Sequence, residues 1–160
     1  MFRCDRNLEI TGRQGGGGVL LAVTNDLISS RVDIFNNRIP GCECVCVKIP
    51  NNKGNILYIC VVYFRPKSQL GVYQSFYDIF LQINGFFNQK VVIIGDFNLT
   101  IHGKDSCLYN GDSLCRELST FLNLHNLTLK NDVLNFQNKT LDLIISNVDE
   151  VFVLSIVMIS

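Results

Sequence analysis

The segment Val91–Asn98 reads VVIIGDFN, and it decides how the rest of the chain is interpreted. Its continuous apolar run predicts a strand that stops abruptly at Asp96 and Asn98. Residues two positions apart at a strand end project to the same side. The segment therefore predicts a carboxylate and a carboxamide held together at a rigid sheet edge, where an active site can be positioned. Taken alone, an Asp after a strand is more often a helix cap or a turn residue.

Apolar runs rich in Val, Ile and Cys predict further strands. They are Val19–Val23, Val32–Phe35, Cys42–Ile49, Ile56–Tyr63, Leu141–Ile145 and Val151–Val157. Apolar residues recur with the helical period over 72–87 and 114–122, which predicts two amphipathic helices. This order excludes a simple strand-helix alternation. It predicts an α/β fold in which two facing mixed β-sheets have helices outside them.

Size and composition indicate one domain over residues 1–160, because 160 residues with 48% hydrophobic positions can bury one sizeable core. Val151–Ile159 is the longest apolar stretch and is far shorter than the roughly 20 residues of a bilayer span. Phe2–Arg6 is followed by polar residues rather than by an apolar run, unlike the start of a signal peptide. We therefore expect an intracellular chain with no membrane partner.

Seven cysteines without an export signal indicate reduced thiols rather than disulfides. Cys42, Cys44 and Cys46 alternate along one strand, so their sulfurs share one face of a sheet. Zinc sites favour Cys-x-x-Cys turns, so core packing is expected here. The glycine run Gly15–Gly18 lacks the Lys-Ser/Thr ending of a phosphate loop and precedes a strand, which favours a tight turn.

The formal net charge is zero, so no global basic field indicates a nucleic-acid partner. The charges are nevertheless unevenly distributed. Residues 1–67 carry nine Lys/Arg against five Asp/Glu, and residues 68–160 carry five against nine. This distribution fits a phosphate-binding side facing an acidic side, and a chance split of this size is about as common.

Four ordered elements resemble the endonuclease/exonuclease/phosphatase superfamily, and specifically the endonuclease domain of non-LTR retrotransposons. Gly95–Asn98 resembles its Gly-Asp-Φ-Asn motif, and Tyr63–Pro66 its Tyr-Arg-Pro element. Thr140–Asn147 resembles the Thr-Leu-Asp-Leu-Ile segment of the retrotransposon branch, and Arg3–Val19 resembles an N-terminal element of that branch. The resemblance runs from Arg3 to Asn147 in the family's order.

The resemblance implies a four-layer α/β sandwich and a Mg²⁺-dependent phosphodiesterase, with Mn²⁺ as a possible substitute. Such an enzyme nicks target DNA so that the reverse transcriptase domain of the same polyprotein can use the new end. Its partners would be DNA and that reverse transcriptase, and it would act in the nucleus. No membrane partner is implied.

The resemblance also implies roles for four residues at the site. Asp96 would orient or deprotonate the attacking water, and Asn98 would hydrogen-bond the phosphoryl oxygens or the nucleophile. Tyr63 would contact the scissile phosphate, or simply pack at a strand end. Asp142 would orient a catalytic His, or else lie on an exposed face.

Two cations follow Tyr63 directly in the sequence. Arg65 and Lys67 would clamp DNA phosphates without reading bases, although solvated loop charges are the simpler interpretation.

Departures from the family pattern predict an impaired fragment that is incomplete at both termini. The family's metal-binding Glu is expected upstream of Met1, and its catalytic His after Ser160, so Mg²⁺ would be held weakly if at all. Glu43 is expected to face solvent and not to replace that Glu. His102 and His125 do not match the catalytic His, and His125 is expected to cap a helix.

Two alternatives remain. One is a degenerate remnant that keeps a partial fold and weak DNA affinity but no catalysis. The other keeps the superfamily but acts on a lipid or inositol phosphate, which the segments Thr140–Asn147 and Arg3–Val19 disfavour.

Overall fold

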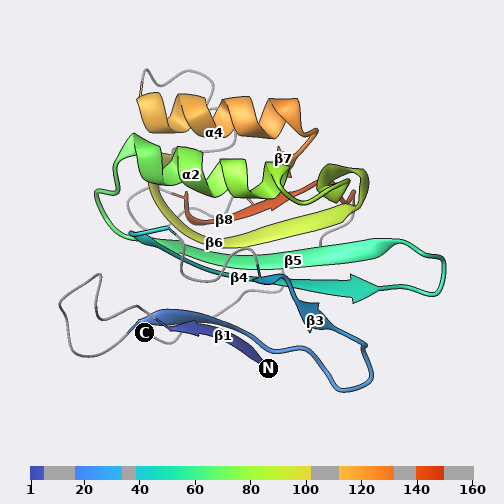
Figure 1. Ribbon diagram of the computed structural model, residues 1–160. Coiled ribbons are helices and arrows are strands. Elements are labelled where there is room, and N and C mark those ends of the chain that lie inside the picture. Colours follow the sequence, from blue (N-terminus) through green and yellow to red (C-terminus); the bar gives the residue numbers. More distant parts are fainter. Residues whose placement is uncertain (6–16, 34–38, 102–111, 132–139, 150–160) are drawn as a thin grey trace.

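The computed structural model describes residues 1–5, 17–33, 39–101, 112–131 and 140–149 (Figure 1). The predicted strand Val151–Val157, Gly15 and Gly16 of the glycine run, and His102 lie outside these residues. The strands are β1 Phe2–Asp5, β2 Gly18–Leu21, β3 Ser30–Arg31, β4 Cys42–Pro50, β5 Ile56–Phe64, β6 Lys90–Ile101, β7 Thr128–Leu129 and β8 Thr140–Ser146. The helices are α2 Leu70–Leu81, the short 3₁₀ helix η2 Phe86–Asn88, and α4 Ser113–Leu124.

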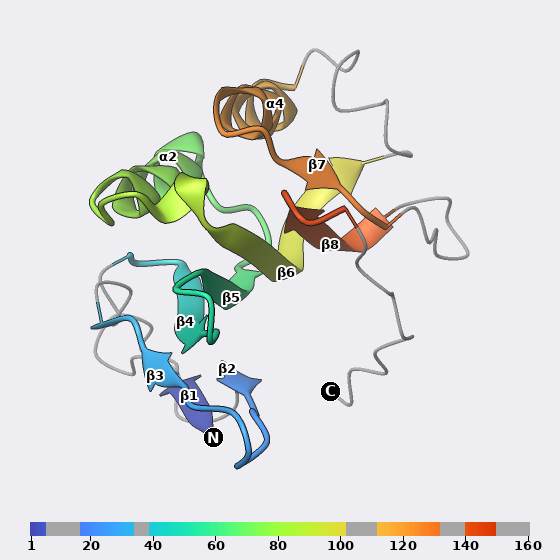
Figure 2. The ribbon, with the colours of Figure 1, turned by 90° about the vertical axis from the view of Figure 1, so that its right-hand side faces the viewer.

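Six strands form the central sheet in the order β3-β4-β5-β6-β8-β7. β5 and β6 run parallel, and the other neighbours are antiparallel. The parallel pair requires a crossover, which α2 and η2 supply over one face of the sheet. The two longer helices, α2 and α4, lie on that face of the six-stranded sheet, and the β1–β2 sheet lies on the other face (Figures 1 and 2).

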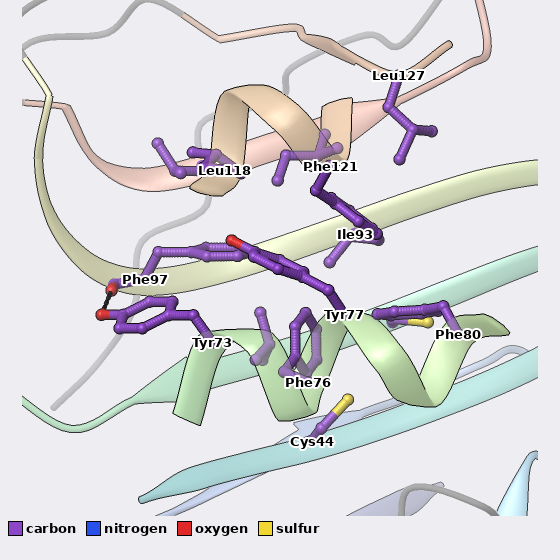
Figure 3. Close-up of a cluster of buried hydrophobic side chains, with 14 of the residues drawn as sticks. Cys44, Tyr73, Phe76, Tyr77, Phe80, Ile93, Phe97, Leu118, Phe121 and Leu127 are labelled. Carbon is purple, nitrogen blue, oxygen red and sulfur yellow. Dashed lines mark hydrogen bonds between the residues drawn. The ribbon is translucent and has the colours of Figure 1, made fainter. Parts of the chain in front are cut away.

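The core between the helices and the sheet is largely aromatic (Figure 3). Phe64 stacks on Tyr73 with ring centroids 4.3 Å apart and meets Phe76 edge-on at 5.1 Å. The Tyr73 hydroxyl donates a 2.7 Å hydrogen bond to the Phe97 carbonyl. Burial, and then the nearby charge of Asp96, raises the pKa of Tyr73 far above its ordinary value, so the hydroxyl stays protonated as a donor.

The first predicted helix is shorter than its apolar period suggested. α2 ends at Leu81, and after a turn the chain continues as η2. Gln82 is the C-cap of α2, and Gly85, the residue before η2, adopts the left-handed conformation with φ of 68° in the turn between them. Phe86 and Phe87 keep the apolar period yet belong to η2, because the turn returns them to the same core.

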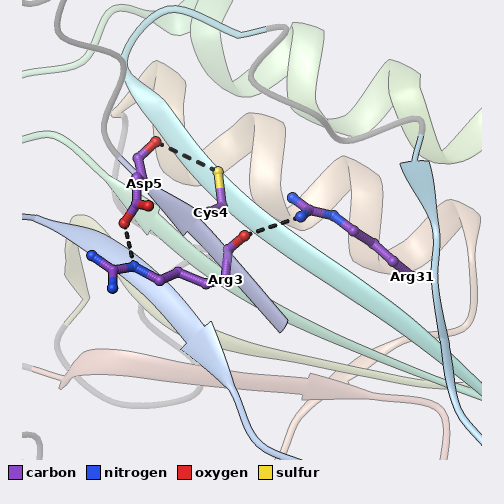
Figure 4. Close-up of polar contacts among 4 residues, drawn as sticks. All are labelled: Arg3, Cys4, Asp5 and Arg31. Carbon is purple, nitrogen blue, oxygen red and sulfur yellow. Dashed lines mark hydrogen bonds and ion pairs between the residues drawn. The ribbon is translucent and has the colours of Figure 1, made fainter. Parts of the chain in front are cut away.

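The β1–β2 sheet covers the opposite face of β4. Cys4 and Val19 are buried there against Val45, Val47 and Ile49. The Arg31 guanidinium donates a 3.0 Å hydrogen bond to the Arg3 carbonyl, tying β3 to β1 (Figure 4). Arg3 and Asp5 form an exposed ion pair. The sequence did not predict β1, because only Cys4 of its residues is buried.

The architecture confirms the α/β class with two facing sheets and helices outside the larger one. The strand predicted at Val32–Phe35 is wrong for its described residues: β3 is Ser30–Arg31, so Val32 and Asp33 follow the strand, and residues 34 and 35 lie outside the described residues. Cys42, Cys44 and Cys46 share the face of β4 beneath the helices and are buried in the core, as expected. Burial raises the pKa of Cys42 and Cys44 well above that of an ordinary thiol. None of the helices in the described ranges is long and apolar enough to cross a bilayer.

Candidate active site

Three polar side chains form a row across neighbouring strands. Tyr63 of β5 is registered with Asp96 of β6, and Asp96 is registered with Asp142 of β8. Registered residues project from the same face of a sheet, so all three point to the side that carries β1 and β2. Tyr63 and Asp96 thus lie side by side on neighbouring strands.

Gly95 allows β6 to approach β5 closely. A Cβ atom at this position would lie 1.8 Å from the Val62 carbonyl oxygen, and the residue adopts φ of 154°. No L-residue fits there without moving β5. The glycine of the Gly-Asp-Phe-Asn motif therefore sets the close spacing on which the register of Asp96 beside Tyr63 depends.

Phe97 and Asn98 turn the chain out of regular pairing. Phe97 is buried in the core between the sheet and the helices. The β6–β8 register shifts between Asp96 and Ile101, and Asn98 adopts φ of 49° within this irregularity. Asn tolerates the left-handed region better than other non-glycine residues because its short polar side chain can bond locally.

The Asn98 side chain holds Asp96 in place. Its Nδ2 donates to the Phe64 carbonyl at 2.6 Å and to Asp96 Oδ2 at 3.0 Å. The Asn98 backbone N–H donates to Asp96 Oδ1 at 2.8 Å. The Phe64 carbonyl can only accept, so the amide orientation is fixed, and both amide hydrogens are committed. In this arrangement Asn98 orients Asp96, and its amide oxygen is the atom that can face an additional donor or a cation.

Asn131 supports Asp142 from the other side of β8. Its Nδ2 donates to the Asp142 carbonyl, and its Oδ1 accepts the Ile144 N–H at 2.7 Å. The side chain thus extends the ladder that β7 forms with β8. Sequence reasoning missed Asn131, because Asn is frequent throughout the chain and nothing local distinguishes this one.

Glu43 is buried, which corrects the expectation that it faces solvent. It is 4% exposed and is registered with Tyr63. Its Oε1 lies 3.8 Å from Nη2 of Arg65. Glu43 does point away from its buried cysteine neighbours, but that face is covered by β1 and β2 and by Arg65.

The remaining residues singled out from the sequence, Arg65, Lys67 and His125, lie outside the row of Tyr63, Asp96 and Asp142. Arg65 is half-buried in its pair with Glu43, and Lys67 is exposed in the turn that follows, with φ of 64°. His125 ends α4 and stacks on Phe87 with ring centroids 3.6 Å apart, so it is a helix-terminal residue as expected. Burial lowers the pKa of His125.

Among solved structures, the chain is similar to the endonuclease domain of TRAS1, a telomere-specific non-LTR retrotransposon. The TM-score is 0.55 and the identity 15%, over 77% of this chain and 57% of that chain. This chain has the endonuclease/exonuclease/phosphatase fold. With 57% of that chain covered, it spans little more than half the length of the TRAS1 domain.

A structure of the human Nocturnin catalytic domain with bound sulfate anion is also similar, with a TM-score of 0.47 and 14% identity over 75% of this chain and 47% of that chain. No family model matches the sequence. Comparison with curated proteins finds no match.

Within this endonuclease/exonuclease/phosphatase fold, the surroundings of Asp96 and Asp142 disfavour the charged form of both carboxylates. Burial, and next the neighbouring charge of Asp142, raises the pKa of Asp96, while the hydrogen bonds from Asn98 oppose the rise. Partial burial also raises the pKa of Asp142, although its side chain keeps solvent contact. Adjacent, partly desolvated oxygen ligands suit a hard divalent cation, whose charge would relieve both effects. Asp96, Asp142 and the Asn98 amide oxygen are the residues that would hold it.

The raised carboxylate pKa values predict a pH-dependent stability cost. An acid whose folded pKa is raised contributes stability below its ordinary value of 3.8 and loses that contribution as pH rises through the folded pKa. We therefore expect Asp142→Asn to raise the melting temperature at pH 7 and not at pH 3, where both carboxyls are protonated. The same substitution should lower the pKa of Asp96, measured by NMR titration of its carboxyl carbon. An equal gain in melting temperature at both pH values would contradict this origin of the cost.

Proposed function

We propose that this chain is the core of a metal-dependent phosphodiesterase that nicks target DNA for retrotransposition. The observation that supports it best is the registered row of Tyr63, Asp96 and Asp142, in which Asn98 fixes both oxygens of Asp96. The fold shared with the TRAS1 endonuclease domain agrees with a nuclease. In the whole protein, the nicked DNA would be passed to an associated reverse transcriptase, and the site of action would be the nucleus.

The chemistry follows from what each side chain can do. Asp96 retains acceptor sites beside its bonds to Asn98, and it would use one to orient the attacking water. Tyr63 would donate its hydroxyl to a phosphate oxygen, and Asp142, on the other side of Asp96 along the row, would orient a hydrogen-bond donor. Mg²⁺ or Mn²⁺, when bound, would neutralise phosphate charge. The raised pKa of Asp96 suits a group that exchanges a proton during the reaction.

We further propose that the 160 residues alone are catalytically impaired. Phosphodiester hydrolysis needs groups that act as a unit, so losing some of them removes most of the rate. The chain spans 57% of the TRAS1 domain, so part of that domain has no counterpart in these 160 residues. The alternative is a degenerate remnant that binds DNA weakly without catalysis.

Nicking of supercoiled plasmid in Mg²⁺ tests both parts of this proposal. The 160-residue chain should nick no faster than the same chain carrying Asp96→Ala. A chain extended to the limits of its genomic reading frame should nick, and Asp96→Ala should lower that rate by about 100-fold or more. If the extended chain folds and does not nick, the degenerate alternative holds. Robust nicking by the 160 residues, abolished by Asp96→Ala, would show that this chain already holds a working site.

A further inference from the structure

A buried acid, Glu43, lies at the end of the row and has no role in the mechanism above. Its side chain is 5% exposed, and its carboxylate lies 3.8 Å from the guanidinium of Arg65. Register places it directly beside Tyr63. Burying an ion pair costs desolvation energy that the attraction often only offsets, so stability alone is a weak reason for such a pair.

Arg65 is fixed at both its backbone and its side chain. Its N–H donates to the Gly41 carbonyl at 3.0 Å, and its carbonyl accepts from the Ser68 hydroxyl at 2.8 Å. Glu43 Oε1 adds an ion pair with Nη2 of the guanidinium at 3.8 Å. These contacts hold a cation two residues after Tyr63, on the same face of the sheet.

The guanidinium has donors to spare. Its side chain is 31% exposed, and within the described residues the buried Nε has no hydrogen-bond partner. A guanidinium presents five N–H donors in a planar fork that matches two oxygens of a phosphate. Because Nε is buried, the Nη donors that the 3.8 Å contact with Glu43 does not use are the ones that face an anion at the exposed edge.

We propose that Glu43 is a positioning residue that holds Arg65 as a preorganised fork for a DNA phosphate next to the scissile one. Neighbouring strands lie about 4.8 Å apart, so Glu43, two strands from Asp96, is about 10 Å across the sheet from it. Tyr63, which would contact the scissile phosphate, lies between them, so the Arg65 guanidinium beside Glu43 is placed for the next phosphate along the strand. This inference rests on the proposed function, because it assumes that DNA runs across the row.

Binding of a fluorescein-labelled DNA duplex, measured by anisotropy at several salt concentrations, tests the positioning role. The deciding observation is whether Glu43→Gln raises or lowers the affinity for DNA. Glu43→Gln adds one positive charge to the chain, so electrostatics alone would tighten binding. A positioning role predicts the opposite: affinity should fall roughly fivefold to tenfold, because the fork loses its anchor. The slope of log affinity against log salt should fall by up to about 1.

Two variants serve as controls. Asp78→Asn makes the same charge change on the exposed surface of α2 and should leave affinity unchanged or slightly higher. Arg65→Lys keeps the charge without the fork and should weaken binding about as much as Glu43→Gln. Melting curves confirm that each variant is folded, and Glu43→Asp, which keeps the carboxylate, should retain more affinity than Glu43→Gln.

The outcomes separate this inference from the proposed function. Unchanged or tighter binding by folded Glu43→Gln would overturn the positioning role while leaving the nuclease proposal intact. If Glu43→Gln does not fold, Arg65→Lys decides, and undiminished binding by that variant would overturn the fork. Absence of any DNA binding by the unsubstituted chain at low salt would overturn the inference and count against the proposed function as well.

Discussion

Gly95→Ala is expected to abolish folding of the chain. The new Cβ would lie 1.8 Å from the Val62 carbonyl oxygen, which belongs to the backbone of the neighbouring parallel strand. β5 would have to separate from β6 at the centre of the sheet, and φ of 154° is also poorly accessible to alanine. We expect a loss of about 4 kcal/mol or more in the free energy of unfolding, most of the stability of a typical small domain. Circular dichroism and urea titration measure it.

Gly71→Ala is the matched control for this prediction. Gly71 lies in the first turn of α2, and a Cβ there meets nothing within 4 Å. Alanine is a better helix former, so this variant should be more stable by about 0.5–1 kcal/mol. A Gly95→Ala chain as stable as the Gly71→Ala chain would show that β5 and β6 are not packed as closely as described.

Asn98→Ala has the second-largest expected effect, a loss of about 2–4 kcal/mol in the free energy of unfolding. Part of the loss comes from forcing alanine to adopt φ of 49°. The rest comes from the buried Phe64 carbonyl and Asp96 Oδ2, which lose the amide that donates to them at 2.6 and 3.0 Å. Urea unfolding measures the total.

Asn98→Gly separates the two contributions. Glycine adopts the left-handed conformation freely, so this variant should recover about 1 kcal/mol relative to Asn98→Ala while lacking the same hydrogen bonds. The pKa of Asp96 should rise in both variants, because a hydrogen bond that lowers it is lost. Equal stability of the two variants would show that the backbone conformation of Asn98 costs nothing.

The residues of the site were predictable where local pattern and family order agree. An apolar run ending in Gly95–Asn98 places an acid and an amide at a strand end, and the matched order along the chain places Tyr63 and Asp142 in the same fold. The strand register that joins them is a tertiary property. It depends on Gly95 and on the crossover through α2, and neither of these features alone predicts the register from the sequence.

The failures have specific physical causes. Alternation correctly put Glu43 on the face opposite Cys42 and Cys44, but alternation does not say what covers that face. The strand β1, which covers that face, was not predicted because its exposed Arg3 and Asp5 interrupt any apolar run. The helical period continued past Leu81 because the turn at Gly85 returns Phe86 to the core. Asn131 bonds to β8 only through tertiary packing.

The central proposal is that Asp96, Asn98 and Asp142 would hold one divalent cation facing a phosphate. Binding of Mn²⁺ to the 160-residue chain, followed by the loss of backbone amide signals in two-dimensional NMR, tests it most directly. We expect selective broadening at Tyr63, Asp96 and Asp142, sharp signals throughout the buried faces of α2 and α4, and loss of the effect in Asp96→Asn. Broadening that is absent at millimolar Mn²⁺, or that centres elsewhere and survives Asp96→Asn, would contradict the claim.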